Sequence, residues 1–213
     1  KEEAMGANKI GTTQRGIGPC YIDKIARNGI RIGDLLEPER FRDKLEWNVK
    51  EKNDMLTRYG KDTFDLEELY ERFMKLAEKI RHRIIDGVVE INEAIEEGKQ
   101  VLFEGAQALM LDIDYGTYPY VTSSSPTAGG VTVGTGVSPK KINRILGVMK
   151  AYTTRVGEGP FPTELNDETG EKLRTVGHEY GATTGRPRRC GWLDLVIGRY
   201  AVLIDGLTDI VLT

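Results

Sequence analysis

The sequence predicts an α/β protein in which a largely parallel β-sheet carries flanking helices and the first half contains a helical subdomain. Residues 37–100 repeat apolar side chains at helical spacing, whereas residues 101–213 alternate short apolar runs with loops rich in glycine and threonine. The order strand, loop, helix, strand in the second part is typical of parallel sheets. We therefore expect residues 1–213 to form the central part of one larger α/β domain, with a helical subdomain at 37–100 and a sheet-forming part at 101–213.

The first predicted helix of this subdomain begins at Pro38, because proline suits the first turn of a helix. Phe41, Leu45 and Val49 follow at four-residue spacing and form one apolar face. Gly60 is a plausible end for this helix.

A second helix is predicted to begin after Asp65, which has Glu68 three residues on, as in a capping box. Gly87 is expected to bend or divide it, and Gly98 to end it. Its apolar face carries Leu69, Phe73, Ala77, Ile80 and Ile84.

Short apolar runs in the second part predict strands at Val101–Phe103, Ile145–Tyr152 and Ile210–Thr213. A helix is predicted at Leu193–Leu203. The sequence leaves Ala128–Val131 ambiguous between a tight approach of the backbone and the opening of another helix.

Composition excludes several classes of protein. Lys and Arg number 30 against 33 Asp and Glu, a net charge of −3, so neither nucleic acid nor an anionic membrane is expected as a partner. Cys20 and Cys190 form no CxxC pair, which argues against a disulfide scaffold or a zinc site and favours reduced thiols in the cytoplasm. No apolar run is long enough to span a bilayer. Any anion must therefore be held by local clusters of arginine.

Residues 6–36 carry turn signals and little periodicity, and Gly11–Pro19 is their densest motif. Glycines let a backbone approach a ligand closely, while hydroxyls, backbone N–H groups and a guanidinium suit phosphate oxygens. A plain turn is the alternative. The pattern of a Walker A loop is absent from the chain. Arg27 and Arg31, further on, are either solvated or functional.

Phe103–Gln107 directly follows a predicted strand, where α/β proteins place ligand loops. The amide of Gln107 can donate to and accept from a planar heterocycle, although a capped turn is the alternative.

Asp112 and Asp114 resemble the start of a calcium loop, but the glycine and the distal glutamate are misplaced, so calcium is rejected. The hydroxyl run at Thr122–Ser125 either holds a phosphate or is simply a loop.

Gly181–Arg189 places three arginines in four residues on a Gly-Thr-Thr loop. Like charges this close repel one another unless anions are near, and each guanidinium can clamp a carboxylate or phosphate in bidentate fashion. The alternative is a solvated basic turn. Without an anionic ligand, we expect these arginines to stay solvated and the loop to be open or poorly ordered.

Together these segments resemble the adenylosuccinate synthetase family. The motifs occur in the family's order and cover the chain from about residue 6 to its end, although residues 37–100 match only as a helical region. The motifs that carry the resemblance are Thr12–Pro19, Phe103–Gln107, Asp112–Ser124, Thr154–Glu164, and Gly181–Arg188 followed by Gly191–Asp194.

The resemblance implies a ligase of purine nucleotide biosynthesis, in which GTP phosphorylates the 6-oxygen of inosine monophosphate and aspartate then displaces that phosphate. Thr13 and Thr122 look like the residues that hold the nucleotide's phosphate. Arg27 resembles an arginine that reaches this phosphate from the other subunit of a homodimer. Gln107 corresponds to the glutamine that assists beside the purine 6-oxygen, and Arg186 contacts inosine monophosphate as well as aspartate.

The same resemblance assigns the arginine loop to aspartate, with Arg15 assisting at its carboxylate and Arg188 also approaching GTP. The loop residues are Ala182, Thr183, Thr184, Gly185, Arg186, Pro187 and Arg188.

Family members also have an upstream glycine-rich phosphate loop with the catalytic acid, base and magnesium ligands, and a downstream guanine-reading motif. Neither is in this sequence, so we expect Mg²⁺ to have no ligand here and the 213 residues alone to be inactive. The alternative is a non-catalytic, dimerising module that binds a purine nucleotide.

Overall fold

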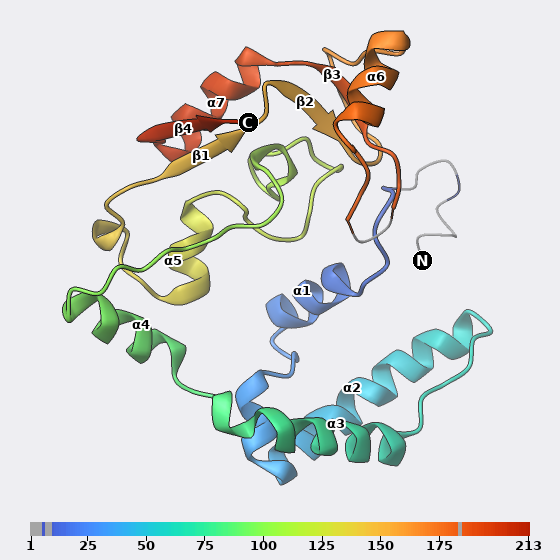
Figure 1. Cartoon of the computed structure of the whole chain (residues 1–213). Coiled ribbons are helices and arrows are strands. Elements are labelled where there is room, and N and C mark those ends of the chain that lie inside the picture. Colours follow the sequence, from blue (N-terminus) through green and yellow to red (C-terminus); the bar gives the residue numbers. More distant parts are fainter. Residues whose placement is uncertain (1–5, 7–9, 183–184) are drawn as a thin grey trace. The chain divides into compact units, whose positions relative to one another are not determined.

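The structure is a computed structural model that describes residues 6, 10–182 and 185–213 (Figure 1). The chain forms two compact units. The helical unit is Gly16–Glu93, and the sheet unit comprises the described residues up to Arg15 together with Ala94–Thr213. The proposed domain bounds of 37–100 and 101–213 stay predictions about the larger domain.

The helical unit contains the two helices that the apolar spacing predicted. The second of them is divided as expected, because one helix ends at Ile80 and another begins at Gly87. Pro38 occupies the first turn of the first predicted helix, and the carboxylate of Asp65 accepts a hydrogen bond of 2.8 Å from the backbone N–H of Glu68 at the start of the second. Its elements are α1 (Ile17–Ala26), η2 (Ile32–Leu36), α2 (Pro38–Arg58), α3 (Leu66–Ile80), η3 (Arg81–Arg83) and α4 (Gly87–Glu96), which ends in the sheet unit.

Helix α1 was not predicted, although Ile17, Tyr21 and Ile25 recur at four-residue spacing, because turn signals dominate residues 6–36. Ile22 and Ile25 are 62% and 76% exposed, and no residue of α1 is buried.

The core of the helical unit forms where α2 packs against α3 and η2. The ring of Phe41 is 2% exposed, and its centroid lies 5.9 Å from that of Tyr70 and 6.1 Å from that of Phe73. Aromatic pairs at these separations add to the stabilisation from burial. The buried core residues are Leu35, Phe41, Leu45, Val49 and Ala77.

A buried carboxylate fixes η2 to α2 within this unit. Asp34 is 3% exposed, accepts the backbone N–H of Arg31 at 2.7 Å, and forms ion pairs with Arg40 and Lys44. Burial alone would raise the pKa of Asp34, but the hydrogen bonds from Lys44 and Arg31 and the nearby positive charges hold it below the ordinary value.

Among its described residues the sheet unit contains two pairs of strands, which confirms the α/β class. β1 (Leu146–Met149) and β4 (Asp209–Leu212) are parallel, and β2 (Tyr152–Arg155) and β3 (Arg189–Trp192) are antiparallel. The helices are η4 (Leu109–Leu111), α5 (Gly129–Thr135), η5 (Pro139–Lys141), α6 (Glu168–Val176) and α7 (Leu195–Asp205).

Two of the predicted strands differ from the structure. The run Ile145–Tyr152 divides after Met149, so that β1 pairs with β4 and the following β2 pairs with β3. The strand predicted at Val101–Phe103 is wrong, because these residues lie outside every described strand and Leu102 is 84% exposed. Apolar residues form a strand only where a neighbouring backbone satisfies their N–H and C=O groups.

In the sheet unit, the helix predicted at Leu193–Leu203 is confirmed as α7, and the ambiguous segment at Ala128–Val131 opens helix α5. Asp194 caps α7 by accepting hydrogen bonds from the N–H groups of Val196 and Ile197, and Gly206 ends it with φ of 60°. None of the described helices is long and apolar enough to cross a membrane.

The core of the helical unit gives a stability prediction. Phe41→Ala should lower the free energy of unfolding by about 3–5 kcal/mol, because it removes a buried ring and leaves a cavity. Trp47→Ala on the same helix is the control: its side chain is 65% exposed, so the change should stay within about 1 kcal/mol. Urea denaturation followed by circular dichroism measures both, and equal losses would contradict the assigned core.

Candidate functional site

The predicted arginine loop in the sheet unit is carried by two antiparallel segments. Tyr180 and Pro187 form an antiparallel bridge, and the backbone N–H of Arg188 donates to the carbonyl of Glu179 at 2.9 Å. We call residues 179–188 the arginine hairpin. Its base is therefore fixed by backbone hydrogen bonds, as in a β-ladder.

Two arginines at this base have carboxylate partners from the chain itself. Nη1 of Arg188 lies 2.7 Å from Glu179 Oε2, and Arg189 forms a bidentate pair with Glu164 through contacts of 2.7 and 2.5 Å. The expectation that these arginines repel one another and stay solvated without a ligand is thus wrong for both. The missing anions are supplied by carboxylates that lie far enough away in sequence to escape the local pattern.

Glu179 is the most enclosed member of this cluster, at 2% exposed. Its carboxylate also accepts hydrogen bonds from Lys150 Nζ and the Tyr152 hydroxyl. Burial alone would raise the pKa of Glu179, but hydrogen bonds from Lys150, Tyr152 and Arg188 hold it below the ordinary value. The hydrogen bond to Glu179, with burial, raises the pKa of Tyr152 to about 12. Glu179 is therefore a carboxylate and Tyr152 a neutral phenol near neutral pH.

Arg186, in the motif Gly181–Arg189, contacts the motif Gly11–Pro19 near the start of the sequence. Its Nη2 donates to the carbonyl of Gly11 at 3.1 Å, across 175 residues of sequence. Gly157 lies at the same place with φ of 80°, and a Cβ added there would be 3.8 Å from Arg186 Nη2 and 4.0 Å from the Gly11 oxygen. Three of the motifs therefore meet around this guanidinium.

Residues 157–159 are held through their carbonyl groups by two further arginines. Arg155 Nε donates to the carbonyl of Glu158 at 2.8 Å, and Arg189 Nη1 donates to those of Gly157 and Gly159 at 3.2 and 2.9 Å. Arg155 and Arg189 are directly opposite each other in the register of β2 and β3. Opposed like charges destabilise a sheet unless each has its own acceptors, and here both have them.

Arg155 also contacts the loop at residues 117–120, which the sequence did not reveal. Its Nη2 donates to Thr117 Oγ1 at 2.8 Å and to the carbonyl of Tyr120 at 3.0 Å. Burial, with the nearby charge of Arg189, lowers the pKa of Arg155 below its usual range. The signal in the sequence was that Arg155 lies within the Thr154–Glu164 motif, two residues before a Gly-Glu-Gly segment.

The segment at residues 112–125, which includes the hydroxyl run, begins with the fully buried carboxylate of Asp112. Asp112 Oδ1 accepts the N–H groups of Asp114 and Tyr115 at 2.9 and 3.1 Å. Thr122 is half-buried, its N–H donates to the Leu111 carbonyl at 2.8 Å, and its hydroxyl faces that of Ser124 at 3.4 Å. Asp112 therefore stabilises the turn at residues 112–115, and a separate backbone hydrogen bond ties Thr122 to the residue just before that turn.

The remaining predicted site residues are exposed. Gln107 has φ of 64°, and Thr13 and Arg15 follow Gly11 in the sheet unit. Arg27 belongs to the helical unit, where it caps the end of α1 with φ of 66°. Left-handed conformations in non-glycine residues are uncommon, but Gln14 and His178 share them and at Arg27 the conformation simply ends a helix, so the roles of Gln107 and Arg27 stay predictions.

Within the arginine hairpin, Ala182, Gly185 and Pro187 are also exposed, and Gly185 has φ of 65°. Thr183 and Thr184 lie outside the described residues. Among the described side chains, no group of three or more His, Cys, Asp or Glu is placed to hold a metal ion.

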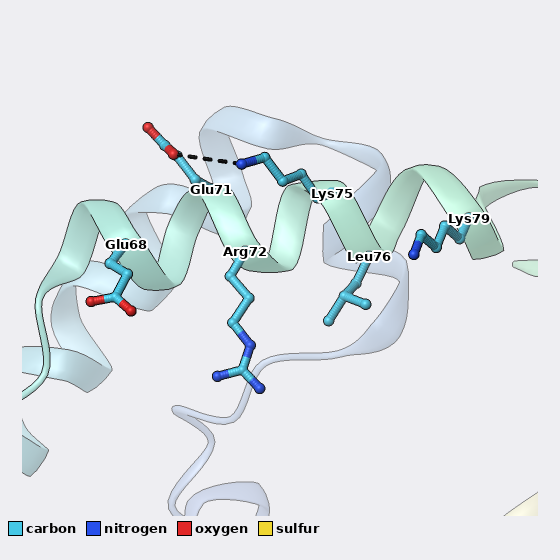
Figure 2. A pocket seen from close by; sticks show the side chains of 6 residues that line it. All are labelled: Glu68, Glu71, Arg72, Lys75, Leu76 and Lys79. Atoms are coloured by element: carbon cyan, nitrogen blue, oxygen red, sulfur yellow. Dashed lines mark ion pairs between the residues drawn. The ribbon is translucent and has the colours of Figure 1, made fainter.

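A separate hollow of about 420 Å³ in the helical unit carries none of the predicted site residues. Figure 2 shows that its lining side chains all come from α3 and that Glu71 and Lys75 point toward each other. This pair is separated by 3.9 Å and both partners are exposed, so the hollow is a solvated charged helix face. It is lined by Glu68, Glu71, Arg72, Lys75, Leu76 and Lys79.

Comparison with known proteins gives one consistent result. The family model for adenylosuccinate synthetase matches residues 1–213. The chain is 64% identical to an adenylosuccinate synthetase of Fusobacterium nucleatum and 61% identical to that of Heliobacterium modesticaldum, each over 100% of the chain and 50% of the relative. The structure of fully ligated adenylosuccinate synthetase from Plasmodium falciparum superposes with a TM-score of 0.91 at 48% identity, covering 99% of this chain and 49% of that one. The chain thus spans about half the length of the curated relatives it matches.

The ion pair of Glu164 predicts a pH-dependent stability. Hydrogen bonds from Arg189 lower the pKa of Glu164 below its ordinary value. The contribution of this ion pair to the free energy of unfolding is therefore complete at a pH above the unfolded-state pKa of Glu164, and it is lost as the pH falls through the folded-state pKa. Glu164→Gln should cost about 1–3 kcal/mol at pH 7, and the difference from wild type should shrink below pH 4.5. Urea denaturation across that pH range measures this. Glu46→Gln, at an exposed position, should have little effect, and a pH-independent loss in Glu164→Gln would contradict the assignment.

Proposed function

This chain belongs to the adenylosuccinate synthetase family, and we propose on that premise that the protein containing it ligates inosine monophosphate to aspartate using GTP. The 6-oxygen of inosine monophosphate attacks the γ-phosphorus of GTP and GDP leaves. The amine of aspartate then attacks carbon 6 and gives up a proton, the bond between carbon 6 and its oxygen breaks, and phosphate leaves carrying that oxygen. The products are adenylosuccinate, GDP and phosphate.

The observation that carries this proposal is the meeting of Arg186 with Gly11 and Gly157. Two anionic substrates and GTP must be brought together, which needs guanidinium groups on segments that approach one another closely. The glycines allow that approach, and Arg186 supplies a charge where the first and last motifs meet. We assign Arg186 to both inosine monophosphate and aspartate.

The nucleotide is proposed to bind through Thr13, Thr122 and Gln107. Hydroxyls hold the phosphate, and the amide of Gln107 donates to the 6-oxygen as negative charge builds there. The half-buried, hydrogen-bonded position of Thr122 supports this assignment, because it leaves the hydroxyl on an organised loop.

Aspartate is proposed to bind the arginine hairpin from Ala182 to Arg188, with Arg15 assisting, and Arg188 also approaches GTP. The family's dependence on GTP suggests that magnesium neutralises the transferred phosphate. The described residues offer no cluster of carboxylates that would hold this ion, so no step of the mechanism is assigned to metal ligands in this chain. The cytoplasm is the proposed compartment, in agreement with two free cysteines.

An assay for adenylosuccinate formation from inosine monophosphate, aspartate, GTP and magnesium tests the function in the gene product that contains this chain. Binding of the nucleotide without turnover would instead favour a non-catalytic nucleotide-binding module.

Arg188→Leu should raise the KM for aspartate at least about tenfold and lower turnover, because a charge-assisted hydrogen bond to the substrate carboxylate is lost. The KM for inosine monophosphate should change little. Lys150 still neutralises Glu179 in this variant, so the fold should persist, which a thermal melt checks. An unchanged dependence on aspartate would mean that Arg188 forms only a structural ion pair.

We also propose that the protein is a homodimer in which Arg27 completes the partner's nucleotide site. Arg27→Ala and Gln107→Ala subunits should each be nearly inactive. After subunit exchange, an equal mixture should regain about a quarter of the wild-type activity, because half of the dimers are mixed and each mixed dimer has one intact site. Exchange is verified by mass spectrometry, and a mixture no more active than its parents would rule out shared sites.

A further inference from the structure

We propose that Glu179 is a positioning residue for aspartate binding, because its buried carboxylate holds one edge of Arg188 and leaves the remaining N–H groups of that guanidinium for the ligand. This inference rests on the proposed function. It concerns a residue that contacts no substrate and acts only through Arg188.

The arginine hairpin brings these two side chains together at its base. The backbone N–H of Arg188 donates to the Glu179 carbonyl at 2.9 Å, and the ion pair between the side chains spans 2.7 Å. Arg174 Nε fixes the same point by donating to the Arg188 carbonyl at 2.9 Å. Glu179 is 2% exposed, whereas the Arg188 side chain is 29% exposed. The carboxylate is therefore enclosed, while the Arg188 side chain stays partly exposed.

The neighbouring arginine shows what a purely structural guanidinium looks like here. Glu164 occupies Nε and Nη2 of Arg189, and the carbonyls of Gly157 and Gly159 occupy its Nη1. By contrast, Nη1 is the one guanidinium nitrogen of Arg188 that donates to a described residue, and its partner is Glu179. A guanidinium carries five N–H donors in a planar fork, so Arg188 keeps an edge that can hold a carboxylate.

The charges around Glu179 favour an anion rather than neutralising the site. Lys150 and Arg188 bring two positive charges to one carboxylate, and the phenol of Tyr152 is neutral near pH 7. The cluster thus retains one positive charge. Glu179 keeps Lys150 and Arg188 together without cancelling the attraction for a ligand, and it fixes the orientation of Arg188 before binding, which reduces the ordering cost.

Steady-state kinetics of Glu179→Gln in the gene product that contains this chain test the inference. The variant keeps the side-chain size but removes the charge that orients Arg188. The KM for aspartate should rise about tenfold, while the KM for inosine monophosphate stays within about twofold. Glu164→Gln is the matched control, since it removes the carboxylate partner of the adjacent Arg189 and should leave the KM for aspartate within about twofold.

A double-mutant cycle separates positioning from general destabilisation. In an Arg188→Leu background, Glu179→Gln should add no further increase in the KM for aspartate, because its effect runs through the guanidinium that is already gone. If Glu179→Gln does not fold, Glu179→Asp replaces it, since it keeps the charge but shortens the reach, and the KM for aspartate should still rise.

Three outcomes would overturn the inference: an unchanged KM for aspartate, equal increases in KM for both substrates, or additive effects in the double mutant. Absence of adenylosuccinate formation by the wild-type protein would refute the proposed function instead. An active wild type with an unaffected Glu179 variant refutes the positioning role alone.

Discussion

The sheet unit depends on guanidinium groups that are satisfied by acceptors from the chain itself. Arg155 and Arg189 face each other across β2 and β3, where two positive charges would repel. Glu164 balances Arg189, while neutral oxygens surround Arg155. Because those oxygens belong to residues 117–120 and to Glu158, the two strands also fix the loops that adjoin the candidate site. Removing a single acceptor would weaken this arrangement without abolishing it, because the carbonyls of Gly157 and Gly159 still accept from Arg189 when Glu164 is lost.

The helical half was predictable because its determinants are local. A proline in the first turn, an aspartate cap and four-residue apolar spacing each act within one helix, and each appears in the structure. The strands were harder, since pairing is a property of two segments. The run around Met149 forms two strands because its first part, β1, pairs with β4 and its second part, β2, pairs with β3. The periodicity of a single run does not specify which strands it will pair with. Val101–Phe103 has strand-like composition without a ladder.

For the site, sequence motifs identified the segments but not Glu179, the carboxylate that organises the base of the arginine hairpin. Glu179 stands in an ordinary polar stretch, and its partners Lys150, Tyr152 and Arg188 lie 29, 27 and 9 residues away. Only the fold brings these four side chains together. The error about solvated arginines has the same origin, because charge repulsion was judged from a window that excluded Glu179 and Glu164.

The use of arginine at position 188 follows from this geometry. The side chain must satisfy an enclosed carboxylate on one side and, in the proposed reaction, hold a substrate carboxylate on the other. A lysine ammonium is a compact point charge, so a lysine that satisfied Glu179 would have no second planar edge for a bidentate contact. Lys150, whose ammonium meets the same carboxylate, illustrates that simpler role. Of these two side chains, Arg188 therefore combines an ion pair to Glu179 with an edge that can bind a ligand. The buried charge of Glu179 orients the guanidinium so that this edge stays available.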